Sequence, residues 1–373
     1  MLADRDPFVG MGARRAAGEE TALAPQSVPV PQVSPGDDPT VSVVIPCFNE
    51  EGFIGKVLEN LAPQYDAGRF EIVVVDGRSE DATRARIAEF AARHPALSVR
   101  LVDNPARHIP AALNLGIAAA RGEIVVRMDA HSVPSPTYVR RCVELLGEAG
   151  AAVVGMPWRI RPGAQTLIAR AISLAVAHPF GVGDAQYRLA TGGGPPRAVD
   201  TVPFGVFRKE LWRRLGGFDE RLLANEDYDF NYRVRAAGGT VLLDTAAYCD
   251  YFARPTAGAL ARQYFRYGRW KAQMLKRNPR SVRWRQLVAP AFVASLAVAA
   301  ALAVAAAVNL LTPLAALPLA LVAGTYALAA GASALQISAR GRDPRLAPAL
   351  VAIFFILHAA WGGGFLLGLP RRS

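Results

Sequence analysis

Two side chains that can bind a metal ion end a run of strand-like residues. The segment "VVRMDAHSVP" (125–134) passes from apolar residues to Asp129 and His131, which stand two positions apart. Because alternate residues of a strand point to one side, this spacing can aim both side chains at one point. A carboxylate with an imidazole suits Mn²⁺, whereas Mg²⁺ prefers oxygen ligands and would leave His131 further from the ion. The same residues also fit an ordinary turn.

Alternating strands and helices must position this pair. The pattern predicts strands at 41–46, 70–77, 98–104 and 122–131 and helices at 50–64, 79–94 and 109–121. Strands that are apolar on both faces and separated by helices are typical of a largely parallel sheet with helices on both faces. Ligands bind such sheets at the carboxyl ends of the strands, and acids stand there at Asp76, Asp103 and Asp129.

The C-terminal part of the chain has a different texture. Hydrophobic residues make up 52% of the chain, and three stretches near its end carry no Asp, Glu, Lys or Arg: 287–311, 313–337 and 346–369. A bilayer core about 30 Å thick needs about 20 helical residues to cross it. We therefore predict three transmembrane helices within 287–370. Buried helices of a soluble bundle are the alternative.

Basic residues beside these stretches indicate their orientation. The segments "KAQMLKRNPRSVRWRQ" (271–286) and "SARGRDPR" (338–345) belong on the cytoplasmic side by the positive-inside rule. The final "PRRS" would then lie outside, against the rule, so re-entry of the third stretch stays open. The chain does not start with basic residues followed by an apolar run, as a signal peptide would. We expect a multi-pass protein of the cell inner membrane with its N-terminal domain in the cytoplasm.

The sequence predicts four regions. These are a flexible tail at 1–39, an α/β domain at 40–255, a basic amphipathic interface segment at 256–286 and the transmembrane helices at 287–370. The net charge, 42 − 31 = +11, would suit nucleic acid, anionic lipid or a phosphorylated substrate. A recognition helix, zinc-finger spacing and aromatic RNA-binding motifs are missing from the sequence, so we expect no nucleic-acid partner. The three cysteines form no CxxC pair, which is typical of a reducing compartment.

Several ordered motifs give the α/β region a family resemblance. They are "VSVVIPCFNEE", "EIVVVDGRSEDAT", "ALNLGIAAARGEIVVRMDAH", "FGVFRKELWRRLGGFDERL" and "NEDYDFNYRVRAAGG". Residues 41 to about 250 resemble family 2 glycosyltransferases of the GT-A fold, a Rossmann-like, mostly parallel sheet with helices on both faces. The likeness is strongest to bacterial succinoglycan glucosyltransferases. It implies that Asp129 opens the metal-binding DxD motif, with His131 standing where many relatives have Asp.

The resemblance also implies donor-binding roles. Residues after the first strand would hold the nucleoside: Pro46, Asn49 and Glu50. Asp76 would accept a hydrogen bond from the uracil ring. Arg78, Ser79 and Asp81 follow it, although Asp81 fits the first turn of a helix equally well. Asn114 corresponds to a residue near the donor, or else is a buried polar group satisfied by the backbone.

Two acidic residues at a predicted helix start are candidates for catalysis. Glu226 and Asp227 fit the acids that the helix dipole favours in a first turn. The resemblance makes Asp227 the general base that takes a proton from the acceptor hydroxyl. An inverting transfer needs one such base, while a metal ion assists the departure of the nucleotide.

The segment "RQYFRYGRWK" (262–271) precedes the first apolar stretch. Its QxxRY pattern resembles the QxxRW of membrane-bound synthases, which implies that Arg266 pairs with donor phosphate oxygens. A basic amphipathic helix on anionic lipid is the other interpretation.

These features together predict a membrane-anchored, inverting, Mn²⁺- or Mg²⁺-dependent glycosyltransferase. By resemblance, it would move a hexose, with glucose expected, from a UDP-sugar to a lipid-linked saccharide in extracellular polysaccharide biosynthesis. A polyprenyl-phosphate glycosyltransferase is one alternative. A scaffold or transport subunit with a degenerate transferase domain is the other.

Overall fold

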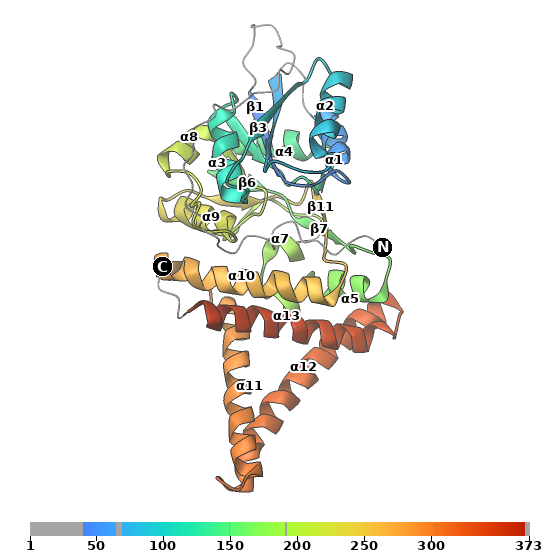
Figure 1. Cartoon of the computed structure of the whole chain (residues 1–373), viewed down its shortest axis with the longest axis vertical. Coiled ribbons are helices and arrows are strands. Elements are labelled where there is room, and N and C mark those ends of the chain that lie inside the picture. Colours follow the sequence, from blue (N-terminus) through green and yellow to red (C-terminus); the bar gives the residue numbers. More distant parts are fainter. Residues whose placement is uncertain (1–39, 65–68, 149, 191, 370–373) are drawn as a thin grey trace. The chain divides into compact units, whose positions relative to one another are not determined.

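The computed structural model describes residues 40–64, 69–148, 150–190 and 192–369, which fall into two compact units (Figure 1). Of the described residues, the first unit contains 40–157 and 192–250, and the second contains 158–190 and 251–369. The predicted tail at 1–39 and the "PRRS" end at 370–373 lie outside the described residues. We predicted one domain over 40–255, whereas 158–191 packs with the C-terminal helices.

Within the described residues, eight strands of the first unit form one mixed sheet in the order β3-β2-β1-β4-β9-β6-β10-β8. The strands are β1 (Val41–Cys47), β2 (Phe70–Asp76), β3 (Ser98–Asp103), β4 (Ile124–Arg127), β6 (Val153–Gly155), β8 (Arg197–Ala198), β9 (Val206–Arg208) and β10 (Val241–Leu243). The pairs β1–β2, β2–β3, β1–β4 and β6–β10 are parallel, and β8 and β9 pair antiparallel with their neighbours. The prediction of a mostly parallel sheet is confirmed.

The register brings the carboxyl ends of the strands to one edge. Cys47 of β1 pairs with Asp76 of β2, and Asp76 pairs with Asp103 of β3. On the other side of β1, Arg127 of β4 pairs with Val44. Because β2 is buried along its whole length, its apolar residues are covered on both faces, as expected for an interior parallel strand.

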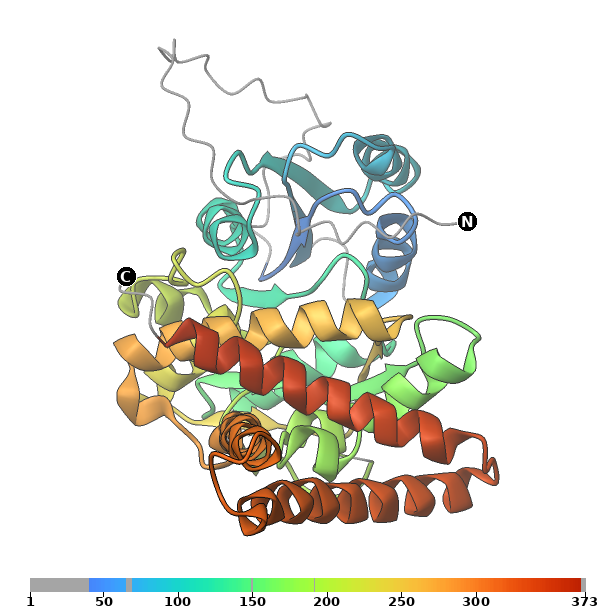
Figure 2. The ribbon, with the colours of Figure 1, turned by 60° about the horizontal axis from the view of Figure 1, so that its bottom comes forward.

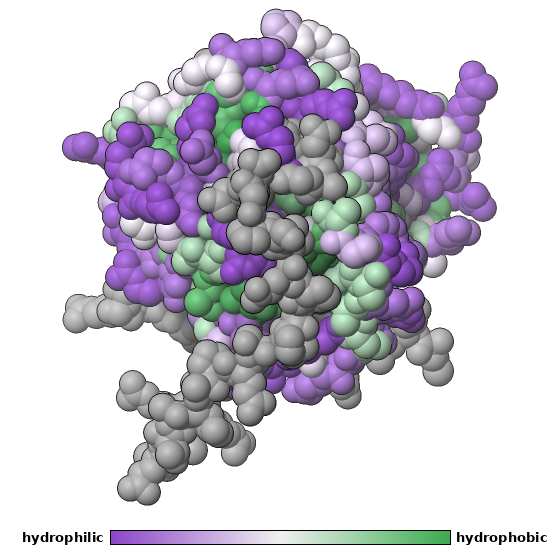
Figure 3. Space-filling view, turned by 90° about the horizontal axis from the view of Figure 1, so that it is seen from above, coloured by the Kyte–Doolittle hydropathy of each residue, from purple (hydrophilic) through white to green (hydrophobic). Residues whose placement is uncertain are grey.

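Helices cover both faces of this sheet. They are α1 (Ile54–Leu61), the 3₁₀ turn η1 (Ala62–Gln64), α2 (Thr83–Arg93), α3 (Ile109–Ala119), α4 (Tyr138–Glu148), α8 (Lys209–Arg214) and α9 (Glu226–Ala236). Helices α1 and α2 lie on one face and α3 on the other (Figure 2). Gly116 allows α3 to approach closely, since a Cβ there would lie 2.4 Å from Val44 Cγ1. The view from above shows a mostly hydrophilic surface (Figure 3).

The strand β11 (Cys249–Phe252) carries the chain from the first unit into the second. In the first unit its Cys249 and Asp250 pair antiparallel with β5 (Val133–Pro134), directly after the "DAH" segment. This pairing anchors the chain that follows Asp129 and His131.

The second unit is built mainly of helices. Its elements are β7 (Trp158–Arg161), α5 (Leu167–Ala175), α6 (Pro179–Val182), α7 (Gln186–Leu189), α10 (Ala257–Arg277), η3 (Pro279–Ser281), α11 (Arg285–Ala307), η4 (Pro313–Ala316), α12 (Leu317–Gly341) and α13 (Leu346–Gly368). In the described part of the chain, three helical segments are long and apolar enough to cross a membrane: Arg285–Ala307, Pro313–Gly341 and Leu346–Gly368. The predicted apolar helices are therefore present.

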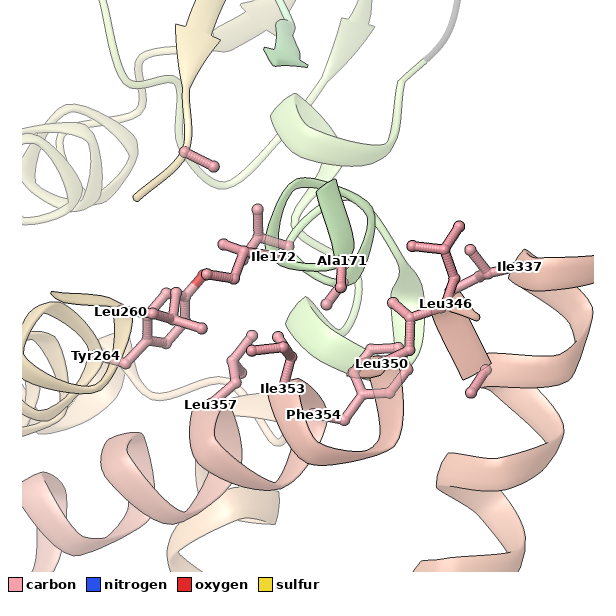
Figure 4. Packing of buried hydrophobic residues seen from close by; sticks show 14 of the residues in the cluster. Ala171, Ile172, Leu260, Tyr264, Ile337, Leu346, Leu350, Ile353, Phe354 and Leu357 are labelled. Carbon is pink, nitrogen blue, oxygen red and sulfur yellow. The ribbon is translucent and has the colours of Figure 1, made fainter. Parts of the chain in front are cut away.

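An apolar core joins α5, α10, α12 and α13 in the second unit (Figure 4). Ile172 of α5 and Leu260 of α10 pack in one cluster with Ile353, Phe354 and Leu357 of α13. These side chains are almost completely shielded from solvent. One face of α13 is therefore committed to protein contacts.

Candidate active site

The strand β4 ends at Arg127, four residues earlier than predicted, so Asp129 and His131 lie in the turn that follows it and strand alternation does not orient them. Their shared role in binding a metal stays a prediction. Their side chains are 22% and 35% exposed, so a ligand can reach both. His131 Nδ1 lies 2.9 Å from Oε1 of Glu50, a residue that follows β1. A carboxylate on one ring nitrogen fixes the orientation of an imidazole, which is how proteins prepare a histidine for a metal ion. The contact thus joins the Glu50 segment to the "DAH" segment.

Arg127, which we did not single out from the sequence, connects two of the predicted acidic sites. It is buried, and its Nη2 lies 3.0 Å from Glu226 Oε1 and 3.5 Å from Asp129 Oδ1. Burial alone would lower the pKa of Arg127, but Glu226, Asp129 and Asp227 raise it, so the guanidinium stays charged. An arginine at the end of an apolar strand, two residues before the predicted ligand Asp129, was the available signal.

The N-terminus of α9 supplies the two adjacent acids. Glu226 is buried against Arg127, whereas Asp227 is only half-buried. Burial raises the pKa of Glu226, Arg127 opposes this, and the charge of Asp227 adds to the rise. Asp227 Oδ1 accepts a hydrogen bond from Tyr228 N at 2.7 Å. The partly open Asp227 is therefore the member of the pair that an acceptor can reach.

The loops after β1 and β2 hold each other in place. Asn49 N donates to Ser79 Oγ at 2.8 Å, and Glu80 N donates back to Asn49 Oδ1 at 2.9 Å. Glu50 N donates to Thr83 Oγ1 at 2.8 Å. Pro46 lies on β1 just before this loop. The predicted nucleoside-binding segment is thus a preorganised pair of loops.

Asp81 belongs to the same loop pair. Burial alone would raise its pKa, but hydrogen bonds from Thr83 and Glu51 keep it lowered. Its Oδ1 accepts from Thr83 N at 3.0 Å, at the start of α2. Asp81 therefore lies two residues before α2, whose first turn contains no acid, and the first-turn interpretation is wrong.

Asp76 is completely buried and tied to its own loop. Its carboxylate accepts hydrogen bonds from Ser79 N at 3.0 Å and from Arg84 Nε at 2.6 Å. Arg84 also pairs with Asp103, at the end of the neighbouring strand. These contacts set the shape of the loop, and the role of Asp76 toward a uracil ring stays a prediction.

Left-handed backbone conformations recur at this edge of the sheet. Asn49 has φ +53°, Arg78 +60° and Arg107 +57°, and each follows one of the strands β1, β2 and β3. Asn225, directly before α9, has φ +66°. This conformation costs a residue other than glycine about 1–2 kcal/mol, and such strain is concentrated at functional sites.

Asn114 joins α3 to the loop before α9. Its Oδ1 accepts from Trp212 Nε1 at 3.1 Å and from Phe218 N at 2.9 Å. Its Nδ2 donates to Phe218 O and to Glu220 Oε1, both at 2.9 Å. These protein contacts use the amide as a structural clamp, and its predicted contact with the donor remains untested.

Arg266 lies on α10 in the second unit, with its guanidinium 6.0 Å from the centre of the Tyr267 ring. Gln263 of the same motif donates to the hydroxyl oxygens of Tyr251 at 3.2 Å and Tyr267 at 3.0 Å. The motif thus forms a local aromatic network. The predicted pairing of Arg266 with a diphosphate stays a prediction.

The residues at the end of β4 fit a divalent cation. Three carboxyl groups lie near the single positive charge of Arg127, namely those of Asp129, Glu226 and Asp227. The region after β4 therefore favours an added positive charge. Two buried donors of Arg127, Nε and Nη1, have no hydrogen-bond partner among the described residues. The described residues contain no cluster of three or more His, Cys, Asp or Glu able to hold a metal. Asp129 and His131 would therefore share the ion with donor oxygens and water.

This geometry defines a class of enzyme. An aspartate and a histidine in the turn after β4, hydrogen-bonded loops after β1 and β2 and a half-buried aspartate at α9 accompany a mostly parallel sheet with helices on both faces, which is the architecture of the GT-A fold. A sequence model of the family described as Glycosyl transferase family 2 matches residues 42–215.

Known proteins place the chain within this class. The succinoglycan biosynthesis protein ExoA of Rhizobium meliloti (strain 1021) is 30% identical over 337 residues, covering 88% of this chain and 96% of that protein. The mannosyltransferase PcManGT from Pyrobaculum calidifontis, solved in complex with GDP-Man and Mn²⁺, has a TM-score of 0.59 and 25% identity, with 87% of each chain covered. The chain belongs to glycosyltransferase family 2 and is a glycosyltransferase.

A further relative indicates the range of acceptors in the group. The dolichyl N-acetyl-alpha-D-glucosaminyl phosphate 3-beta-D-2,3-diacetamido-2,3-dideoxy-beta-D-glucuronosyltransferase of Methanococcus voltae is 24% identical over 249 residues, covering 65% of this chain and 76% of that protein. Its name describes a sugar added to a lipid-linked sugar phosphate.

Proposed function

We propose that the protein is an inverting, metal-assisted transferase that moves glucose from UDP-glucose to a lipid-linked saccharide during extracellular polysaccharide biosynthesis. The observation that carries the proposal is the link made by Arg127 between Asp129 of β4 and Glu226 of α9. It joins the predicted metal ligand to the acidic pair that contains the predicted base. The similarity to a succinoglycan biosynthesis protein supports the pathway, and the similarity to the dolichyl-phosphate sugar transferase of Methanococcus voltae supports a lipid-linked acceptor.

The chain's own residues divide the work of an inverting transfer. Asp227 takes the proton from the acceptor hydroxyl, whose oxygen attacks the anomeric carbon of the sugar while the bond to the nucleotide diphosphate breaks. Glu226 neutralises Arg127 and leaves Asp227 as the accessible carboxylate. The loops after β1 and β2, with Asn49, Glu50 and Asp76, hold the nucleoside.

The metal would be held by Asp129 and His131. When bound, a divalent cation neutralises charge that develops on the departing diphosphate. Glu50 orients His131 for this role through the 2.9 Å contact at Nδ1. Arg127 limits the negative charge that would otherwise accumulate between Asp129 and α9.

Substitution of Asp227 tests the assignment of the base. Asp227→Asn should lower kcat by about 10²–10⁴-fold, the usual contribution of a general base. The thermal stability of the protein should change little. Asp229→Asn is the matched control, because Asp229 lies on the same helix and pairs with Arg233 at 2.8 Å. Transfer within tenfold of the unchanged enzyme by folded Asp227→Asn would exclude this role.

A polyprenyl-phosphate glycosyltransferase is the second candidate. It is favoured by a relative from Pseudomonas aeruginosa (strain UCBPP-PA14), an undecaprenyl-phosphate 4-deoxy-4-formamido-L-arabinose transferase, 32% identical over 157 residues that cover 39% of this chain and 44% of that protein. Product analysis separates the two candidates, because sugar appears either on an existing lipid-linked glycan or on bare lipid phosphate. The scaffold alternative does not fit, since the chain is a glycosyltransferase.

We also propose that the enzyme resides in the cell inner membrane with the catalytic unit in the cytoplasm. The candidate membrane helices and the basic segments beside them support this location. Nucleotide sugars would then reach the site from the cytoplasm, and lipid-linked acceptors from the membrane.

A further inference from the structure

Helices α10 and α13 lie side by side in the second unit (Figures 1 and 2). Their backbones touch, because a Cβ added at Gly364 would lie 2.1 Å from the carbonyl oxygen of Phe265. A Cβ at Gly268 would lie 2.1 Å from the carbonyl oxygen of Trp361, and one at Gly368 would lie 2.7 Å from that of Arg269. The later residues of α10 meet the later residues of α13, so the two helices run in the same direction.

The "GGG" segment of α13 shows how specific this packing is. A Cβ at Gly362 would lie 2.4 Å from the carbonyl oxygen of Ala289 on α11, whereas Gly364 faces α10. Gly363, between them, has nothing within 4 Å of an added Cβ. Small residues allow this kind of close approach between helices in membranes. The direction of α13 is therefore coupled to α10 over a long contact.

Helix α10 is strongly basic. Its six cations are Arg262, Arg266, Arg269, Lys271, Lys276 and Arg277. Between Leu357 and Gly368, α13 packs against α10 over a length of about 16 Å at 1.5 Å per residue. A helix of this composition is typical of the surface of a membrane with anionic lipids.

The charge of α10 determines where α13 can lie. If α13 crossed the bilayer, α10 would have to follow it over the contact region and carry Arg266 and Arg269 into hydrocarbon, whereas Lys271 is buried within the protein. A charged side chain in the hydrocarbon core of a membrane is strongly unfavourable. An orientation along the membrane surface avoids this cost while both helices keep their contact.

Both ends of the α11–α12 hairpin are tied to the segment 158–191. At the start of α11, Arg285 pairs with Asp184, directly after α6. At the end of α12, Asp343 pairs with Arg170 of α5 at 3.0 Å. The two ends of the hairpin therefore lie on one side. The described residues before Arg285 contain no candidate span, so the described chain does not cross the membrane before α11.

The surfaces of the three apolar helices differ. The share of the most apolar 18 residues that is buried inside the protein is 17% for α11, 6% for the segment containing α12 and 39% for α13. Leu321, Leu328 and Leu335 of α12 are exposed, as lipid-facing residues would be. Trp284 at the start of α11 is 73% exposed, and aromatic side chains at such a position prefer the membrane–water interface.

We propose that α11 and α12 alone cross the bilayer and that α13 lies in the membrane surface beside α10, with its exposed apolar residues against lipid. The C-terminus then lies on the same side as the α12–α13 connection. The arginines of the final "PRRS" join the other basic segments on that side, and the conflict with the positive-inside rule disappears.

Cysteine labelling of the full chain tests this arrangement. Single cysteines are introduced as Asn309→Cys between α11 and α12, as Arg340→Cys near the end of α12, and as one cysteine appended after Ser373. Asn309 and Arg340 are exposed, and the native Cys47, Cys142 and Cys249 are buried, so the unchanged chain reports the background. Spheroplasts and opened membranes are treated with a membrane-impermeant maleimide.

The inference predicts that the appended cysteine and Arg340→Cys react from one side of the membrane and Asn309→Cys from the other. With the first unit in the cytoplasm, only Asn309→Cys reacts in intact spheroplasts. An appended cysteine that reacts from the same side as Asn309→Cys means that α13 spans the membrane, and the inference fails. If all three cysteines react from one side, the α11–α12 hairpin does not cross the membrane, and the inference also fails. Transfer activity plays no part in this readout, so the proposed function can fail independently.

Discussion

Arg127 offers a direct test of the electrostatic link at the end of β4. Arg127→Met keeps the apolar stem of the side chain but removes the guanidinium, which leaves Glu226 buried without the partner that lies 3.0 Å away. Removing one partner of a buried ion pair costs about 3–5 kcal/mol. Two donors of Arg127 have no acceptor among the described residues, which already lowers the stability of the folded state. We therefore expect the lower end of this range, about 3 kcal/mol. At about 2–4 °C per kcal/mol, this corresponds to a fall in Tm of about 6–12 °C.

Thermal unfolding of the purified full-length protein, followed by near-UV circular dichroism at pH 7 and pH 5, measures this loss. The loss should shrink at pH 5, because Glu226 without its arginine then takes up a proton and no longer buries a charge. Arg86→Met is the control. Its ion pair with Glu89, at 3.4 Å, is more than half exposed on both sides, so about 0–1 kcal/mol is expected.

Two results would refute this reasoning. If Arg127→Met and Arg86→Met have the same Tm at pH 7, the link between β4 and α9 contributes little. If the deficit of Arg127→Met is as large at pH 5 as at pH 7, an unpaired Glu226 carboxylate is not its cause. In that case the lost packing of the long side chain explains the change.

Three further changes probe the site and the helices. The pKa of Glu226 is raised in the folded state, so Glu226 binds a proton more tightly in the folded than in the unfolded chain. The free energy of unfolding should therefore fall as the pH rises from the ordinary pKa range of glutamate toward neutrality. Glu226→Gln should flatten that part of a stability–pH curve measured by chemical denaturation, and an equally steep curve would contradict the assignment. Glu50→Gln should weaken activation by Mn²⁺ about 10–100-fold, since Glu50 orients His131, and an unchanged Mn²⁺ titration of activity would oppose this role. Gly364→Leu should lower Tm and open the α10–α13 contact to limited proteolysis, whereas Gly363→Leu should do neither, and equal behaviour of the two would argue against the close packing.

The sequence was sufficient for the strands β1 to β4 and the helices between them. Their patterns are local: a run of β-branched residues predicts a buried strand, and apolar residues at helical spacing predict a covering helix. The acids at strand ends followed from the same pattern, since parallel strands end at a common edge, whereas Asn49 and Glu50 were indicated by the family resemblance. The predicted helix at 50–64 begins only at Ile54. The segment 158–191 was harder, because its short helices pack with distant C-terminal residues.

Part of the candidate site depends on contacts that no local pattern carries. Arg127 and Glu226 stand far apart in the chain but 3.0 Å apart in space, and Glu50 and His131 likewise meet at 2.9 Å. Each pair requires the register between strands and the direction of α9 to be known first. Asn114 belongs to the same group, because its four hydrogen bonds join it to Trp212 of α8 and to Phe218 and Glu220 in the loop before α9.

The amino-acid sequence by itself determined which segments are strands, which are helices and which are apolar enough for a membrane, because these properties depend on neighbours a few residues away. Only the tertiary structure decided which charges meet and which way α13 runs. Hydropathy measures how strongly a helix avoids water, but its direction depends on what it packs against. For α13 that partner is α10, whose cations hold it at the membrane surface in our proposal.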